Sequence, residues 1–437
     1  MMISEACSRP QQTATPTHDK RTEREIRRGL NKLPRREFPL SSRLSPSTPN
    51  CCVFLAVNFL RTNHTKYYKL PAAAASIMKL FLLATLLGII WQSTEAAVVA
   101  TVENENPIIG ILAQEMSYSL ENRYPGMYKS FIAASYVKFV EGGGARVVPI
   151  WIDKPREYYE DIMMKINGIL FPGGATWFNQ TNGYSEAAEH IYAIAVDLND
   201  RGEYFPLWGT CLGFELLTYL SANSREHRAH CSSQKQPLPL DFMPDFRSSR
   251  MFAKAPDSII EILANDPVTP NFHQFCVTQE NLTDYGIADQ WRVMSDNKDW
   301  NGFTFLSTIE HTKYPFYGIQ FHPEKNLYEW IYNNNISHTP EAILAAQYFA
   351  QFFVDETRRS DHGFANHSDE NNHMIYNYES TFTGMLGSSY EQCYLFDEDV
   401  DYVTAKGPGD DATCMAHSKW AVLLAFLTAK LIQKLFA

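Results

Sequence analysis

The strongest constraint on the fold of this 437-residue chain is an alternation of short apolar runs with helix-forming segments across residues 98–358. Apolar runs of strand length occupy residues 107–113, 146–152, 168–171 and 204–208. Apolar residues recur at helical spacing in residues 127–141 and 187–201, and a short helix includes residues 162–166. Strands and helices that alternate in this way form right-handed crossovers. The sequence therefore predicts an α/β domain with a mainly parallel central sheet flanked by helices.

The later part of the chain is less regular. Residues 303–306 and 315–321 are predicted strands, and residues 340–358 are a predicted terminal helix. Residues 359–419 are polar, with clusters of Asn, Ser, Asp and His. We expect them to form a flexible tail or stalk.

The first 77 residues differ in composition from the rest, with 13 Lys and Arg against 5 Asp and Glu. They are rich in Pro, Ser, Thr and Arg, which favours a non-folded basic extension. A secretory signal peptide is predicted at residues 78–96, where Lys79 precedes an apolar core and Ala96 ends a small-residue cleavage site. Because a signal normally begins a chain, we expect translation to start at Met78 and leave residues 1–77 untranslated, with Met1 as the alternative.

A secreted chain would make four Asn-x-Ser/Thr motifs credible glycosylation sites. They are Asn179, Asn281, Asn335 and Asn366. The whole chain has a net charge of −11 despite its basic start, which gives no indication of nucleic-acid binding.

The final segment, residues 420–437, is apolar but is interrupted by Lys430 and Lys434. It follows a polar stretch, a layout similar to a GPI-attachment signal. The alternative is an amphipathic terminal helix, since two lysines are costly inside a membrane. We expect contact with a membrane only if this segment is an anchor signal.

Residues 204–215 read YFPLWGTCLGFE, which is a strand, a tight turn and the start of a helix. Cys211 stands at the apex, between Gly209 and Gly213. Small residues at such a turn let it expose a nucleophile, and a helix N-terminus favours a thiolate. The alternative is a buried structural cysteine.

Five cysteines follow the predicted signal, and an odd number leaves at least one unpaired within the chain. They are Cys211, Cys231, Cys276, Cys393 and Cys414. A free Cys211 fits this count. No CxxC pair or histidine cluster has the spacing of a zinc site, so we predict no metal and no cofactor.

His322 and Glu324 are two residues apart, so in extended backbone their side chains point the same way. A carboxylate beside an imidazole fixes its tautomer, and such a histidine could take the proton of Cys211. Backbone N–H groups of Leu212 and of the Gly173–Gly174 turn could bind an oxyanion. Considered alone, a His-Pro-Glu segment such as 322–324 is more often a surface turn. A Pro-Gly-Gly segment such as 172–174 is more often an ordinary end of a strand.

The segments GTCLGFE (209–215) and FHPE (321–324) together resemble the class I glutamine amidotransferase-like superfamily, which has a flavodoxin-like fold. Within it the chain most resembles the gamma-glutamyl hydrolase family. Four further stretches carry this resemblance, which covers about residues 105–355. They are PIIGILAQE (107–115), FIAASYVKFVE (131–141), ILFPGGATWF (169–178) and NFHQF (271–275).

The resemblance implies Cys211 as the nucleophile, His322 as the general base and Glu324 as the orienting carboxylate. His273 matches a second histidine of the family's site, and Glu215 matches an acidic residue where glutaminases usually have Gln. From the residues alone, His273 is better explained as a hydrogen-bonded loop histidine, and the alternative for Glu215 is a solvated carboxylate on a helix face.

The implied protein is an omega-peptidase that cleaves the γ-glutamyl bonds of folylpoly-γ-glutamates through a thioester, with residues 98–358 as its catalytic domain. The resemblance also implies a homodimer, and a lysosomal or extracellular location. Lys138 and Arg123 are candidate ligands for the carboxylates of the substrate. The alternatives are the glutaminase of an amidotransferase and a catalytically inactive secreted member of the superfamily.

Overall fold

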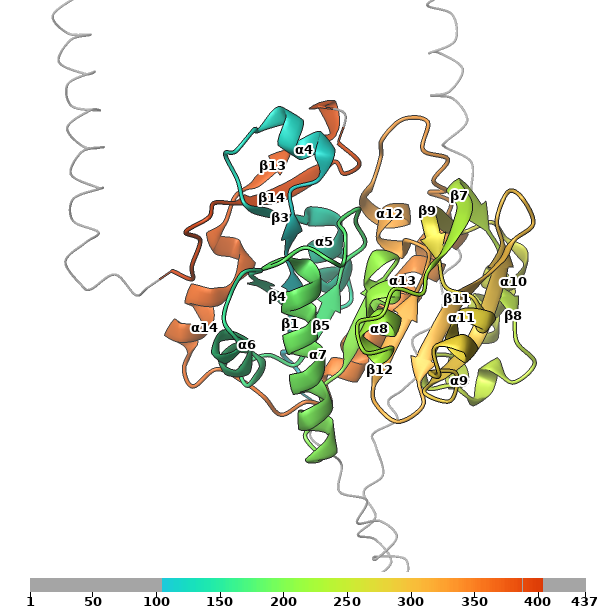
Figure 1. The fold of residues 1–437 in the computed structure, drawn as a ribbon, viewed down its shortest axis with the longest axis horizontal. Coiled ribbons are helices and arrows are strands. Elements are labelled where there is room, and N and C mark those ends of the chain that lie inside the picture. Colours follow the sequence, from blue (N-terminus) through green and yellow to red (C-terminus); the bar gives the residue numbers. More distant parts are fainter. Residues whose placement is uncertain (1–103, 387, 404–437) are drawn as a thin grey trace, which may run out of the picture. The chain divides into compact units, whose positions relative to one another are not determined.

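The computed structural model describes residues 104–386 and 388–403 (Figure 1). The expected basic extension (1–77), signal peptide (78–96) and anchor segment (420–437) lie outside the described residues, as does Cys414. None of the helices in the described residues combines the length and the apolar character that a membrane span requires.

The centre of the fold is an eight-stranded sheet with the order β4-β1-β5-β6-β12-β11-β10-β8. The first five strands are parallel, which confirms the predicted α/β class. They are β4 (Arg146–Ile150), β1 (Ile108–Leu112), β5 (Gly168–Phe171), β6 (Leu207–Thr210) and β12 (Phe316–Ile319). Every residue of these five strands except Arg146 is buried, as expected of strands that are covered on both faces of the sheet.

Three antiparallel strands complete one edge of this sheet. They are β11 (Thr304–His311), β10 (Trp291–Lys298) and β8 (Asp241–Phe242). These three strands come from the part of the sequence in which the alternation of strands and helices is weak.

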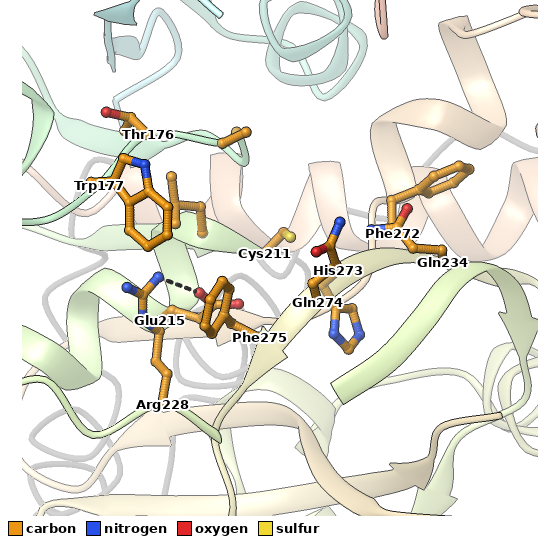
Figure 2. Close-up of a pocket in the computed structure, with 13 residues that line it drawn as sticks. Thr176, Trp177, Cys211, Glu215, Arg228, Gln234, Phe272, His273, Gln274 and Phe275 are labelled. Atoms are coloured by element: carbon orange, nitrogen blue, oxygen red, sulfur yellow. Dashed lines mark hydrogen bonds and ion pairs between the residues drawn. The ribbon is translucent and has the colours of Figure 1, made fainter. Parts of the chain in front are cut away.

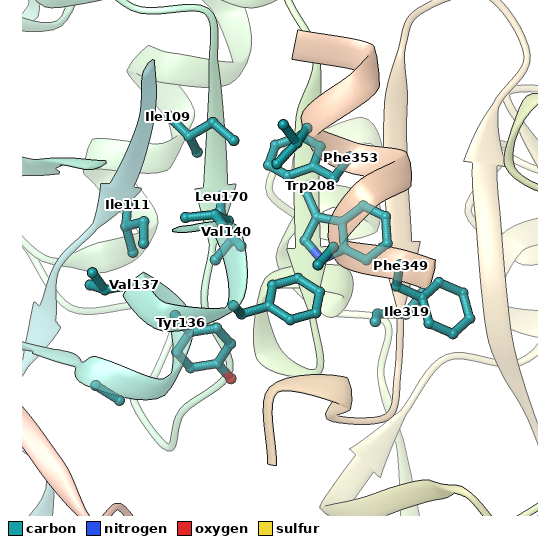
Figure 3. Close-up of a cluster of buried hydrophobic side chains, with 14 of the residues drawn as sticks. Ile109, Ile111, Tyr136, Val137, Val140, Leu170, Trp208, Ile319, Phe349 and Phe353 are labelled. Carbon is teal, nitrogen blue, oxygen red and sulfur yellow. The ribbon is translucent and has the colours of Figure 1, made fainter. Parts of the chain in front are cut away.

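Helices cover both faces of the parallel strands and produce two hydrophobic cores. One core includes α6 (Arg156–Met163), α7 (Tyr184–Asp200) and α8 (Leu212–Ser221). The other includes α5 (Ala134–Gly142) and α13 (Pro340–Thr357). In the second core, Trp208 of β6 lies against the aromatic side chains of α13 (Figure 3).

Residues 127–141 do not form the single helix that their spacing predicts. Their first part is the strand β3 (Ser130–Ala133), and only the second part is the helix α5. β3 pairs with β2 (Gln114–Glu115) on one side and β14 (Gln392–Phe396) on the other. This pairing between distant segments overrides the local helical pattern.

The expectation of a flexible tail from residue 359 is wrong for residues 367–396. They form α14 (His367–His373) and the strands β13 (Ser380–Phe382) and β14, which extend the sheet of β3. Cys393 and Phe396 are buried against the domain, whereas Gln392, Tyr394 and Leu395 are only partly buried. The polar composition of residues 359–419 therefore concealed a short strand that packs on the core.

A separate two-stranded sheet lies beside the antiparallel edge (Figure 1). It pairs β7 (Ala229–Leu238) with β9 (Thr269–Cys276), and a disulfide joins Cys231 to Cys276. The remaining helices are α4 (Tyr118–Arg123), α9 (Arg250–Ala253), α10 (Asp257–Asn265), α11 (Gln279–Asp284) and α12 (Pro323–Tyr328), with 3-10 turns η1 (Phe246–Ser248), η2 (Ile375–Asn377) and η3 (Gly384–Leu386).

Candidate active site

Cys211 occupies a sharp turn between β6 and α8. The backbone φ of Cys211 is +52°, in a region that residues other than glycine rarely adopt. Cys211 is also the N-cap residue of α8. The turn is tight because α8 packs directly on β5. A Cβ on Gly213 would lie 2.0 Å from the carbonyl oxygen of Phe171, so only glycine fits there. The turn therefore has the geometry expected of a nucleophile at the end of a strand.

The thiol of Cys211 is buried, and it is not a ready-made thiolate. Burial raises its pKa well above the usual value, and the carboxylates of Glu215 and Glu324 raise it further. The nearby Leu212 N–H opposes this shift in the pKa of Cys211. The expectation that the helix N-terminus favours a thiolate is therefore outweighed by burial. The cysteine needs a base to ionise it.

His322 and Glu324 form a buried pair. Nδ1 of His322 lies 2.6 Å from Oε1 of Glu324, a short contact typical of a charge-assisted hydrogen bond. This contact favours the tautomer with the proton on Nδ1, which leaves the Nε2 lone pair available. Burial lowers the pKa of His322 despite the carboxylate, so the ring is neutral near pH 7. A neutral imidazole with a free lone pair is suited to act as a base.

Tyr136 of α5 joins the histidine to the Gly173–Gly174 turn. Its hydroxyl oxygen lies 3.2 Å from Nδ1 of His322 and accepts a hydrogen bond from the Gly173 N–H at 2.9 Å. The Gly173 N–H is therefore occupied, and the structure does not support its expected role as an oxyanion donor. The N–H groups of Gly174 and Leu212 remain as candidates.

Gly173 also marks the point at which the histidine and the cysteine converge. A Cβ on Gly173 would lie 2.6 Å from Cε1 of His322 and 3.1 Å from Cβ of Cys211. The two side chains thus approach the same α-carbon from different elements. The structure brings the predicted nucleophile and the predicted base to one place.

Glu215 is buried and connected to the cysteine through Gln320. Nε2 of Gln320 lies 3.1 Å from Oε1 of Glu215 and 3.8 Å from Sγ of Cys211. The other carboxylate oxygen accepts a hydrogen bond from Arg228 at 3.0 Å (Figure 2). Burial raises the pKa of Glu215 to about 7, although Arg228 and Gln320 oppose the shift. Glu215 is thus not a solvated surface carboxylate.

His273 lies on β9, but its imidazole faces away from the sulfur of Cys211 (Figure 2). Its Nε2 is 3.2 Å from Oδ1 of Asn271, and the ring packs edge-on against Phe305. Burial lowers its pKa to about 3, with a further contribution from His322. The neighbouring Phe272 is the β9 side chain whose ring meets His322. His273 is one of the residues that line the same cavity as Cys211, and its role at the site stays a prediction.

Two cavities meet at this site. The first, the Cys211 cavity, has a volume of about 320 Å³ and is lined by Cys211, Leu212, Glu215 and Arg228 with the aromatic rings of Trp177, Phe272 and Phe275 (Figure 2). The second, the His322 cavity, has a volume of about 280 Å³ and is lined by His322, Lys325, Lys235 and Tyr390. They share Gly174, Ala175, Gln234 and Phe272.

Among the described residues, no group of three or more His, Cys, Asp and Glu side chains could hold a metal ion. The other free cysteine in this part of the chain, Cys393, is buried beside Thr383. Burial raises its pKa to about 12, so it lacks the surroundings of a reactive thiol.

Three of the four expected glycosylation sites are exposed, namely Asn179, Asn335 and Asn366. Asn281 is half-buried, because its side chain belongs to the capping box at the start of α11.

Comparison with known proteins places the chain in a family. The model of the family Peptidase C26 matches residues 107–324, which contain Cys211, His322 and Glu324. The human gamma-glutamyl hydrolase is 41% identical over 294 residues, which are 67% of this chain and 90% of the human protein. This chain belongs to the gamma-glutamyl hydrolase family.

More distant relatives agree. Gamma-glutamyl hydrolase B of Dictyostelium discoideum is 39% identical, and the match covers 67% of this chain and 84% of that protein. Gamma-glutamyl hydrolase 1 of Arabidopsis thaliana is 32% identical, and the match covers 67% of this chain and 83% of that protein. Among solved structures, PurLQS from Thermotoga maritima aligns with 56% of this chain and 97% of its own at 14% identity, with a TM-score of 0.34. That similarity is too slight to bear on the fold.

For this member of the family, sequence reasoning missed Tyr136, Gln320 and Arg228. Gln320 could have been found, because it stands two residues before His322 at the end of a strand and so points to the same side. Arg228 has no local signal, since only the approach of β7 to α8 brings it to Glu215. Neither Lys138 nor Arg123 lines either cavity, and Lys138 instead donates to Gln392.

Proposed function

We propose that this protein hydrolyses γ-glutamyl bonds in folylpoly-γ-glutamates through a thioester on Cys211. The observation that carries the proposal is the convergence of Cys211 and His322 on Gly173, with Glu324 2.6 Å from the histidine. The gamma-glutamyl hydrolases among its relatives support the γ-glutamyl part of this assignment.

In the first half of the reaction His322 takes the proton of Cys211, and the sulfur attacks the γ-carbonyl carbon. Glu324 stabilises the imidazolium that forms. The tetrahedral oxyanion accepts hydrogen bonds from the N–H groups of Leu212 and Gly174. When the C–N bond breaks, the imidazolium gives its proton to the leaving amine, which is the amino nitrogen of the next glutamate.

In the second half, water replaces the amine. His322 takes a proton from the water, and the oxygen attacks the thioester carbon. The C–S bond breaks, the sulfur recovers its proton from the imidazolium, and the γ-carboxylic acid leaves. At the end of the cycle Cys211 and His322 have returned to their starting protonation states, so the proposed reaction can be completed by the residues of this chain.

The other predicted site residues have supporting roles in this proposal. Glu215 and Arg228 form one wall of the Cys211 cavity, and Gln320 connects that wall to the sulfur. His273 is a positioning residue that holds β9, and through it Phe272, beside His322. The aromatic rings of the Cys211 cavity offer a surface on which the flat rings of a folate could stack.

The proposal is tested by incubating the protein with pteroyl-γ-glutamate oligomers and, separately, with glutamine. We expect shortened oligomers, no ammonia from glutamine, and loss of turnover in Cys211→Ala. Cys393→Ala is the matched control, because it removes the other buried free thiol of the described residues and leaves the residues of the proposed site unchanged. Ammonia from glutamine alone would support the glutaminase alternative, and turnover of neither substrate would support the inactive one.

We propose further that the chain works in the lysosome or outside the cell. The Cys231–Cys276 disulfide and the exposed Asn-x-Ser/Thr sites favour an oxidising, glycosylating pathway. The expected homodimer stays a prediction that light scattering of the purified protein can check.

A further inference from the structure

Lys325 is a buried cation without an ion-pair partner among the described residues. It lies one residue beyond Glu324, on α12, and is only 5% exposed. Its ammonium makes no hydrogen bond and no ion pair with any residue that the structure describes. Its near neighbours are the faces of two aromatic rings, Tyr390 at 4.4 Å and Phe272 at 5.3 Å. The carboxylate of Glu329, one turn further on, is close enough to feel its charge but is not within ion-pair distance.

Burying an unpaired ammonium is costly, so such groups are normally paired. Lys325 lines the His322 cavity, which leaves room for a ligand beside it. The exposed Lys235 lines the same cavity, and its own ammonium is turned to a backbone carbonyl. The side chains of Ser389 and Asn334 add polar groups to the wall. The cavity therefore has the charge and the donors to bind a carboxylate.

The two cavities differ in which reacting group they contain. Cys211 and Leu212, which would hold the acyl carbon and its oxyanion, line the Cys211 cavity. His322, which would give its proton to the departing amine, lines the His322 cavity. The acyl half of a substrate thus belongs in the first cavity and the leaving half in the second.

We infer that Lys325 binds the α-carboxylate of the glutamate that leaves, and so selects γ-glutamyl bonds followed by a free α-carboxylate. This inference rests on the proposed function. In the leaving glutamate the α-carboxylate is attached to the same carbon as the amine that His322 protonates. Lys325 is three residues after His322 in sequence and lines the same cavity, so one residue can meet the amine while the other meets the carboxylate.

The test compares two substrates that differ only in this carboxylate. One is pteroyl-glutamyl-γ-glutamate, and the other carries isoglutamine as the leaving residue, with an α-carboxamide in place of the α-carboxylate. Wild-type kcat/KM should be about 10- to 100-fold higher for the first, the range of a charge-assisted hydrogen bond. In Lys325→Met this ratio should fall to about 1, while Lys165→Met, a surface lysine paired with Asp161, keeps the wild-type ratio.

The ratio of the two substrates separates selectivity from general damage. Lys325→Met also removes a charge that lowers the pKa of His322, but that effect is common to both substrates and cancels. Lys325→Arg should restore part of the selectivity. Equal rates for both substrates in the wild type, or an unchanged ratio in Lys325→Met, would overturn the inference. Absence of Cys211-dependent turnover on either substrate would instead overturn the proposed function.

Discussion

The hydroxyl of Tyr136 lies 3.2 Å from Nδ1 of His322, the same nitrogen that Glu324 contacts at 2.6 Å. Since Glu324 accepts the Nδ1 proton, the tyrosine oxygen is a second, weaker acceptor for the same N–H. That oxygen also accepts a hydrogen bond from the Gly173 N–H, so a single hydroxyl fixes both the ring of the proposed base and the turn opposite the proposed nucleophile.

Replacing Tyr136 by Phe should lower kcat about 10-fold and leave KM nearly unchanged. The substitution removes one hydroxyl from a fully buried side chain, so that the imidazole loses a constraint and the Gly173 N–H loses its acceptor. Steady-state kinetics measures the split between the two constants. A rise in KM without loss of kcat would show that the hydroxyl serves binding rather than the position of His322.

Gly173→Ala should reduce kcat about 100-fold. The added methyl would sit 2.6 Å from Cε1 of His322 and 2.7 Å from the Tyr136 oxygen, and displacing a catalytic group by about 1 Å has an effect of this size. Gly363→Ala is the matched control, because a Cβ there meets open space. Comparable activity of the two variants would contradict the convergence of Cys211 and His322 at Gly173.

Glu215→Gln should change the pH dependence of stability. Because the folded protein raises the pKa of Glu215 from 4.5 to about 7, the folded state holds its proton more tightly than the unfolded state. This contribution is fully present below pH 4.5 and is lost as the pH rises through 7. Between pH 5 and pH 8 the variant should therefore gain about 2 kcal/mol in unfolding free energy relative to wild type.

Urea denaturation of both proteins at the two pH values measures this change. The attraction of Arg228 to the ionised carboxylate is already included in the pKa of about 7, so the change between the two pH values reports on the titration of Glu215. A difference that stays constant with pH would mean that Glu215 titrates near its ordinary value.

His273→Gln should have the opposite effect. Burial lowers the pKa of His273 to about 3, so its contribution to stability is present above pH 6.5 and is lost as the pH falls toward 3. From pH 7.5 to pH 5, wild type should lose about 2 kcal/mol of unfolding free energy more than the variant. Urea midpoints at the two pH values check this, and equal losses in the two proteins would refute it.

The sequence is most informative where local pattern and tertiary structure agree. The parallel strands and the turn at Cys211 could be predicted because continuous apolar runs and flanking glycines have a direct structural meaning. The pairing of His322 with Glu324 is also predicted, but from an extended backbone, whereas α12 begins at Pro323 and the two side chains meet across the start of a helix.

The parts that escape prediction depend on distant contacts. β3 is a strand because β14, more than 250 residues later, pairs with it. Arg228 and Tyr136 join the site from other elements, and nothing in their own sequence marks them. The neutral thiol of Cys211 escapes prediction because burial is a property of the folded chain, whereas the helix N-terminus is visible in the sequence.

The position of β14 after the other site residues in the sequence has a consequence for when the site is completed during synthesis. Tyr390, just before β14, donates a hydrogen bond to the carbonyl of Gly173 and walls the His322 cavity. On the ribosome, Cys211, His322 and Glu324 all emerge before this tyrosine does. A nascent chain that already carries the proposed nucleophile and the proposed base therefore still lacks one wall of the candidate site, and hydrolytic competence should arrive only once β14 has been made.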